Sequence, residues 1–423
     1  MKTLAKKIRT MSLASLLMLF LAPSFAQNGN GYITINGNLK DAKTKNALFF
    51  AYVTIPSSHV GTVTNSEGNF TFKISPLLNA NEVEFSHLGY ITKRVPVETL
   101  RKGNTEVLLE PASIPLDEIT VRPIDVEKLV ADAIAKIPYN YSDNPNMLTG
   151  FYRETIKQRR DYISISEAVL DIYKAPYKNL SGMDRIKIFK GRKSINVKKA
   201  DTLAVKLQGG PNVSLLLDIA KNIEVLFPED YRNYYNFTLE DMVTIDKKIN
   251  YVVGFAQKEG VTEPLYYGRL YIDTKNLAIT NAQFSLNLDN KDEAAKLFVL
   301  KKPRGVKFMP TSTSYYVNYT EYNGRYYLSY VRNELSFKAN WNRRIFNTSY
   351  TVTAEMAITD RDLINVNKFP YRDILKSSDI LSETVAAFND DDFWGEYNFI
   401  QPEESIQDAI KKYGKRLKRL NEE

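Results

Sequence analysis

The chain has 423 residues, of which 43% are hydrophobic and 25% charged, and this ordinary globular balance excludes a disordered chain. It has no cysteine and only two histidines, His59 and His87, which excludes disulfides, thiol chemistry and histidine-rich zinc sites. The net charge is +8, but without the four N-terminal cations 53 basic residues face 49 acidic ones, a net charge of +4. Nucleic-acid binding is therefore not expected.

Residues 1–26 have the layout of a secretory signal peptide. Basic residues at positions 2, 6, 7 and 9 precede an uncharged run from Met11 to Ala22, and small residues follow up to Ala26. The run is shorter than the roughly 20 apolar residues of a membrane span. We expect cleavage after Ala26 and export to the periplasm or outer membrane; a signal anchor is the alternative. No cysteine is available for a lipoprotein anchor.

Residues 27–110 are predicted to form a small β-sandwich. Four short segments alternate apolar and polar residues, and turn residues such as Gly61 and Asn65 to Gly68 separate them. Several short strands at this spacing are typical of a sandwich. The fold class predicted for the whole chain is mainly β: a small Greek-key sandwich followed by a large antiparallel curved sheet or half-barrel with a few helices.

Several motifs in this block resemble the carboxypeptidase-like regulatory domain, a transthyretin-like sandwich of seven strands. The motifs, in chain order, are Ile35-Asn36-Gly37, Ala51-Tyr52-Val53, Gly61 to Asn65, Gly68-Asn69-Phe70 and Ser86 to Tyr90. Exported bacterial proteins often carry this domain at the front. The resemblance implies a fold and no peptidase activity, because neither histidine begins an H-x-x-E motif and a third is missing.

Residues 111–124 are predicted to be a linker, because three prolines interrupt them; Ile119-Thr120-Val121 is a candidate last strand. A helix is expected next, capped by Asp125 and ended by Pro138, with one apolar stripe from Val126 to Ile137. A second helix is predicted over Val213 to Phe227.

Residues 125–400 are predicted to form the large antiparallel sheet. Long segments alternate, and Asn323-Gly324 between two aromatic-rich runs predicts a type I′ hairpin turn. Gly150 to Glu154, Ser166 to Val169 and Phe393 to Asn398 resemble a family of uncharacterised envelope proteins. Gly268 to Asp273 is weakly similar to part of the lipoprotein-carrier half-barrel.

Two groups of side chains in this block are candidate site residues. In the hairpin expected around a turn at residues 159–161, Arg153 faces Glu167, which predicts a structural ion pair, with ligand binding as the alternative. Tyrosines crowd four of the strands, and they suit either cross-strand packing or an open ligand groove. The groove candidates are Tyr266, Tyr267, Tyr271, Tyr315, Tyr319, Tyr326 and Tyr330.

Residues 401–423 are predicted to form an amphipathic helix with a basic C-terminal end, which either docks on the protein or contacts anionic lipid through residues 403–423.

No catalytic motif, cofactor or metal site is expected. The main functional hypothesis is a non-catalytic envelope adaptor whose partner is another envelope component: a protein, glycan or lipid. The alternatives are a carrier or sensor of a hydrophobic or glycan ligand, and a hydrolase that uses a carboxylate pair.

Overall fold

The computed structural model describes residues 31–112, 124–178, 182–195, 206–207, 210–301, 305–341, 347–387 and 393–403, with Ile406 and Asp408. The expected signal peptide, most of the linker and most of the helix expected over 401–423 lie outside the described residues. Among the helices that are described, none is long and apolar enough to span a membrane.

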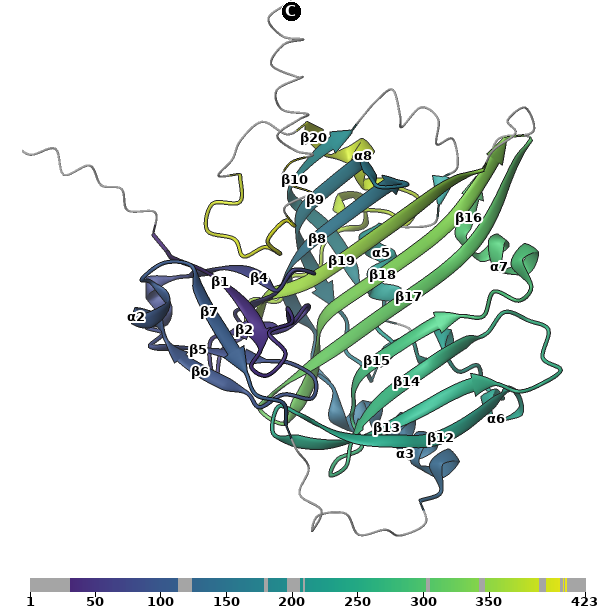
Figure 1. Ribbon diagram of the computed structural model, residues 1–423, viewed down its shortest axis with the longest axis horizontal. Helices are drawn as coiled ribbons and strands as arrows, with labels where there is room; N and C mark the ends of the chain where they lie inside the picture. Colours follow the sequence, from purple (N-terminus) through teal and green to yellow (C-terminus); the bar gives the residue numbers. More distant parts are fainter. Residues whose placement is uncertain are drawn as a thin grey trace, which may run out of the picture.

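The N-terminal part is a sandwich of two sheets with strand orders β4-β1-β7 and β3-β2-β5-β6, as predicted (Figure 1). Its strands are β1 (Ile33–Asp41), β2 (Tyr52–Thr54), β3 (Gly61–Val63), β4 (Asn69–Ile74), β5 (Glu82–Ser86), β6 (Lys93–Pro96) and β7 (Thr105–Leu109).

The alternating residues of these strands meet in one core, in which Phe70, Phe72 and Phe85 are fully buried. Strand β1 pairs with β7 in parallel, and Gly37 makes this approach possible because a Cβ there would lie 2.4 Å from the Thr105 carbonyl oxygen. The sandwich therefore has an apolar core of its own.

The second part is an open sheet of eleven strands, which confirms the predicted fold class. Its order is β12-β13-β14-β15-β17-β18-β19-β8-β9-β10-β20, and every neighbouring pair is antiparallel except β10 with β20. The strands are β8 (Asn146–Gln158), β9 (Asp161–Lys174), β10 (Arg185–Ile195), β12 (Tyr235–Ile245), β13 (Lys248–Gln257), β14 (Tyr266–Asp273), β15 (Ile279–Leu286), β17 (Val306–Tyr322), β18 (Arg325–Trp341), β19 (Thr348–Asp362) and β20 (Ala386–Ala387).

Short elements complete the described fold. Strands β11 (Lys206–Leu207) and β16 (Val299–Lys301) pair with each other. The helices are α2 (Val97–Leu100), α3 (Val126–Asn140), α5 (Pro211–Leu216), α6 (Tyr231–Tyr234), α7 (Lys291–Phe298) and α8 (Leu381–Thr384), with the 3₁₀ turns η2 (Pro76–Leu78), η4 (Ile223–Val225) and η5 (Tyr371–Asp373).

The two faces of the large sheet are covered differently. Helices α3 and α5 pack on what we call the inner face, which carries the largest apolar cluster. The sandwich packs on the opposite, outer face, where Val63 and Phe50 meet Phe151 and Tyr330. Figure 1 shows the sandwich at the left beside β17, β18 and β19.

Helix α3 begins where the sequence predicts, because the Asp125 side chain accepts the Lys128 N–H and caps the first turn. Its end was predicted wrongly: Pro138 lies inside the helix, which continues to Asn140. A proline in the last turn lacks one backbone N–H donor, but the two residues after it keep the helical conformation.

The single helix predicted over Val213 to Phe227 is wrong as well. Helix α5 ends at Leu216, and the chain then turns so that the Asp218 side chain is buried. The Asn222 side-chain amide donates to the carbonyl oxygens of Leu215 and Leu216 and closes the helix end. The polar contacts of the buried Asp218 side chain thus end the helix, although the apolar residues continue at helical spacing.

Candidate functional site

The predicted hairpin register brings Arg153 and Glu167 together. Phe151 faces Val169 and Arg153 faces Glu167, although the turn has two residues and a bulge near Ile163 restores the expected offset. Arg153 Nε lies 2.7 Å from Glu167 Oε1, and both side chains are buried.

This pair belongs to a row of alternating charges across five strands, which we call the charge ladder. Its members are side by side in register on the outer face: Arg332 (β18), Glu355 (β19), Arg153 (β8), Glu167 (β9) and Arg192 (β10). Arg192 Nε contacts Glu167 Oε2 at 2.8 Å. Burial would raise the pKa of Glu167, but Arg153 and Arg192 outweigh it and hold the pKa below its usual value.

Residues 393–403 pack over the charge ladder, and we call this segment the C-terminal strap. Trp394 packs edge-on against Phe151 and under the Arg192 guanidinium, and the Ile400 carbonyl accepts from Arg153. On the sandwich side, Asn398 bonds both backbone groups of Lys73, with distances of 2.7 Å and 3.0 Å. The strap therefore connects the sandwich to the charge ladder.

The seven candidate tyrosines do not form an open groove. Tyr315, Tyr319 and Tyr326 pack in the inner apolar cluster, whereas Tyr330 is fully buried on the outer face beneath the sandwich. Tyr271 is also buried, Tyr266 is partly buried, and Tyr267 is exposed. Most of these rings are therefore packed against other side chains, as in the cross-strand packing alternative, and Tyr267 alone of the seven is exposed.

Buried carboxylates elsewhere are held by partners. Asp218 accepts from Tyr177 and Tyr319 at 2.8 Å and pairs with Lys174 Nζ, also at 2.8 Å. Burial would lower the pKa of Lys174, but Asp184 and Asp218 raise it to about 12. No group of three metal-ligating side chains occurs among the described residues.

The two histidines lie at contacts with neighbouring elements. His59 lies 3.2 Å from Arg361 across the junction of the sandwich and the sheet. Burial, and then the charge of Arg361, lowers the pKa of His59 to about 4. The two ring nitrogens of His87 lie 3.0 Å from the Leu88 carbonyl oxygen and 3.1 Å from the Phe49 carbonyl oxygen.

Most edge strands of the described sheets are covered, short or protected by charged residues. Strand β4 is covered by Asn398, and β3 is buried with Thr62 bonded to the strap. Strand β6 carries Lys93, Arg94 and Pro96, which are residues that natural proteins use to protect an edge. Strand β7 is short, and its Leu108 carbonyl accepts from Lys93. The far edge of the large sheet, β20, has two residues.

Strand β12 is an edge of a different kind. It has eleven residues without a lysine, arginine or proline, and its middle is exposed. Gly89 N–H donates to the Thr244 carbonyl at one end, and the Asp241 carboxylate accepts the Met242 N–H. A groove of about 590 Å³ runs along this edge, lined by Gly89, Ala112 and residues 239–244.

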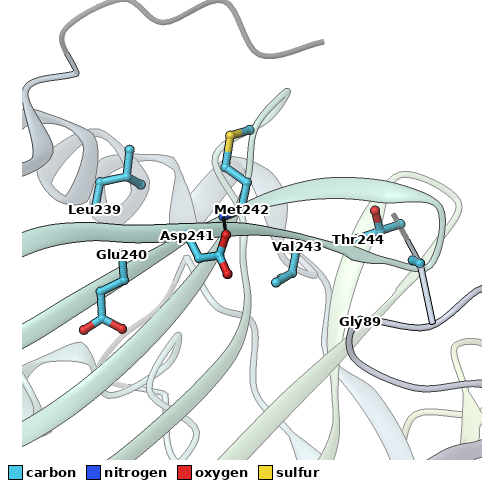
Figure 2. Close-up of a pocket in the computed structure, with 8 residues that line it drawn as sticks. Gly89, Leu239, Glu240, Asp241, Met242, Val243 and Thr244 are labelled. Carbon is cyan, nitrogen blue, oxygen red and sulfur yellow. Dashed lines mark hydrogen bonds between the residues drawn. The ribbon is translucent and has the colours of Figure 1, made fainter. Parts of the chain in front are cut away.

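A bulge shapes the groove. The register with β13 shifts between Leu239 and Asp241, so Glu240 and Asp241 point to the same side, while Leu239 and Met242 point to the other (Figure 2). Glu240 crosses over β13 to pair with Arg269, and a Cβ on Gly254 would lie 2.2 Å from its carboxylate. The edge thus has one apolar side and one acidic side. Its sequence does not alternate simply, and sequence reasoning missed it.

Comparison with known proteins confirms the resemblance of the N-terminal block. Residues 35–121 match the model of the CarboxypepD_reg-like domain, a stretch that covers the sandwich and none of the large sheet. No curated protein matches the chain. A solved structure of a DUF1329 family protein from Desulfovibrio piger ATCC 29098 is 11% identical and covers 56% of this chain and 94% of its own, with a TM-score of 0.23, too low to relate the two folds.

Proposed function

We propose that this protein is a non-catalytic, exported binding module of the cell envelope, in which the exposed edge of β12 accepts an extended segment of another envelope protein. Strand addition supplies main-chain hydrogen bonds for affinity and side-chain contacts for specificity. The observation that carries the proposal is the contrast between β12 and the other sheet edges.

In the described part of the chain, the other sheet edges are protected or short, whereas the middle of β12 is exposed. Lys93, Arg94 and Pro96 protect β6 and the strap covers β4, whereas the middle of β12 carries only Glu240 and Asp241 as charges. A partner strand with apolar residues toward Leu239 and Met242, and basic or polar ones toward Asp241, would complement both sides of the groove.

The non-catalytic role and the export of the chain are supported by two other observations. Glu167 and Asp218 are bound to cations or hydroxyl groups, an arrangement that suits structure better than acid–base chemistry. Export is supported by the basic and uncharged segments of residues 1–26.

The test is site-specific photo-cross-linking in the native envelope. A photoreactive residue at Thr238, which is exposed on β12, is expected to give a discrete adduct with one envelope protein. Leu77 on η2, whose side chain is 91% exposed, is the matched control for chance encounters and should give none. Equal adducts at both positions, or adducts with lipid or glycan only, would contradict the proposal.

A further inference from the structure

Four neighbouring strands of the large sheet end in one row. In register across β19, β8, β9 and β10, the row consists of Asp362, Met147, Tyr173 and Arg185. Because neighbouring strands lie about 4.8 Å apart, the row is roughly 14 Å wide. The chain that leaves β19 and the chain that enters β10 therefore both lie at this end of the sheet.

The chain that leaves β19 crosses this end of the sheet to β10. Lys368 Nζ lies 5.4 Å from the centre of the Tyr173 ring on β9. The Phe369 carbonyl oxygen accepts from the Arg185 guanidinium on β10. We call residues 363–372 the crossing loop, because these contacts place it over the ends of β8 and β9.

The crossing loop presents apolar side chains to solvent from a fixed backbone. Ile364 is 89% exposed, and Leu363 beside it is exposed as well. The Asp362 carboxylate accepts the backbone N–H groups of Ile364 and Asn365, at 2.7 Å and 3.0 Å, and also the Asn365 side-chain amide. A loop that is held in this way loses little further conformational entropy when Ile364 becomes buried in a complex.

Two more apolar side chains are exposed at the same end of the sheet. Tyr371, near the end of the crossing loop, is 64% exposed, and Met183, two residues before β10, is 73% exposed. We call Met183, Leu363, Ile364 and Tyr371 the apolar tips. Large apolar side chains that gather on one exposed surface mark contacts with proteins or membranes.

Cations lie beside the apolar tips. The Arg372 side chain is 85% exposed, and Lys368 is exposed above the Tyr173 ring. Within residues 362–376 three basic residues stand against two acidic ones, and one of the acidic pair, Asp362, is turned toward the amides of the loop. Lysine and arginine next to exposed apolar side chains suit the phosphate groups of a lipid surface.

We propose that the apolar tips, with Lys368 and Arg372, form a site that binds the surface of an anionic phospholipid membrane. Leu363 and Ile364 enter the boundary between headgroups and acyl chains, and Tyr371 lies at the depth of the headgroups. The two cations donate to phosphate oxygens. This inference goes beyond the proposed function, because it concerns a surface other than the β12 edge and specifies which end of the sheet faces the membrane.

The exposure of Ile364 favours a lipid surface over a protein partner. A side chain that is almost fully exposed protrudes from its own surroundings. The side chains that dominate protein interfaces fill packed pockets and are ringed by other contacts. A lipid layer needs no such fit, because headgroups and acyl chains rearrange around an apolar side chain that enters them. Separate protruding tips with cations beside them therefore match a membrane better than a packed protein surface.

A fluorescent label at position 364 tests the site in the full chain. Because the protein has no native cysteine, Ile364→Cys carries a single polarity-sensitive fluorophore. Its emission is expected to shift to the blue when vesicles of phosphatidylcholine mixed with phosphatidylglycerol are added. Leu77→Cys, at a similarly exposed position on η2, is the matched control and should show no shift. Each label reports on its own position, so lipid contact by residues 403–423 does not change the outcome.

Vesicle binding gives a second measurement. Ile364→Ser is expected to lower the affinity for the mixed vesicles at least about tenfold, because the burial of its side chain is lost. Arg372→Gln should lower it about fivefold, and only when phosphatidylglycerol is present. Arg101→Gln on the sandwich is the matched control, since Arg101 is exposed and pairs with a neighbouring carboxylate, as Arg372 does.

Several results would overturn the inference. They are an unshifted label at position 364, equal shifts at positions 364 and 77, unchanged vesicle binding of Ile364→Ser, or equal losses in Arg372→Gln and Arg101→Gln. The outcomes are also separate from those of the proposed function. A shifted label at position 364 without a protein adduct at Thr238 supports the membrane site and contradicts the role of the β12 edge, and the reverse pair of results contradicts the membrane site alone.

Discussion

The two faces of the large sheet bury polar groups in different ways. On the outer face, the charge ladder crosses five strands, and the strap and the sandwich cover it. On the inner face, rings and aliphatic side chains pack under α3 and α5, and the polar contacts gather around Asp218. Apolar packing supplies most of the stability of a fold, whereas paired charges stabilise it only in the right register.

The comparison suggests what each face contributes. A shift of β8 against β19 by two residues would keep every side chain on its own face but would move Arg153 out of register with Glu355 and leave buried charges unpaired. The inner face contains many interchangeable apolar contacts and is less sensitive to such a shift. We therefore expect the ladder to specify strand alignment, and the inner cluster to supply the bulk of the burial.

Removing the central carboxylate of the ladder is expected to have the largest effect. Glu167→Gln leaves Arg153 and Arg192 buried without their shared partner, which should lower the free energy of unfolding by about 3–5 kcal/mol. Urea unfolding measures it. Glu334→Gln is the control, because Glu334 pairs with Arg332 beside the ladder but is partly exposed, and it should cost less than about 1 kcal/mol. Equal losses would show that burial within the ladder does not matter.

On the inner face, Asp218→Asn is expected to cost less than Glu167→Gln, about 2–3 kcal/mol. The amide oxygen still accepts from Tyr319, and Asp184 still pairs with Lys174, so no cation is left alone. The same urea titration measures the effect. A loss larger than that of Glu167→Gln would reverse the ranking of the two faces.

The junction of the sandwich with the sheet should show a small pH dependence. The pKa of His59 is about 4 in the folded chain, below the usual 6.5, so the unfolded chain binds the extra proton first. Stability from this group is present above pH 6.5 and is lost as the pH falls toward 4. Between pH 7 and pH 5, the free energy of unfolding of the unmodified chain should fall by about 1 kcal/mol more than that of His59→Gln, after allowance for solvent screening. Identical pH profiles would contradict this.

The sequence predicts elements whose determinants are local. The Asn323-Gly324 turn, the Asp125 cap and the β8–β9 register all follow from residues close in the chain, and the structure contains each of them. Period-two alternation likewise predicts the sandwich, because each strand turns one side to the core.

Features that depend on distant segments could not be predicted. Nothing in the spacing of Arg332, Glu355 and Arg192 indicates that they join Arg153 and Glu167, since their strands are brought together only by the sheet order. The tyrosine groove was an open alternative, because ring-rich strands look alike whether a helix covers them or solvent does. The β12 edge was missed because its bulge breaks the alternation.

The pairing of β8 with β19 has a consequence for how the chain folds. Arg153 meets Glu355 only after some two hundred intervening residues have been synthesised, so the contact carries a large loop-closure cost and forms late. The sandwich needs only contacts within its own seventy-odd residues and can fold first. Until β19 has been synthesised and has paired, the edge of β8 that β19 covers remains open to pairing with other chains. A nascent copy of this protein therefore needs shielding from its neighbours for longer than its first domain alone would.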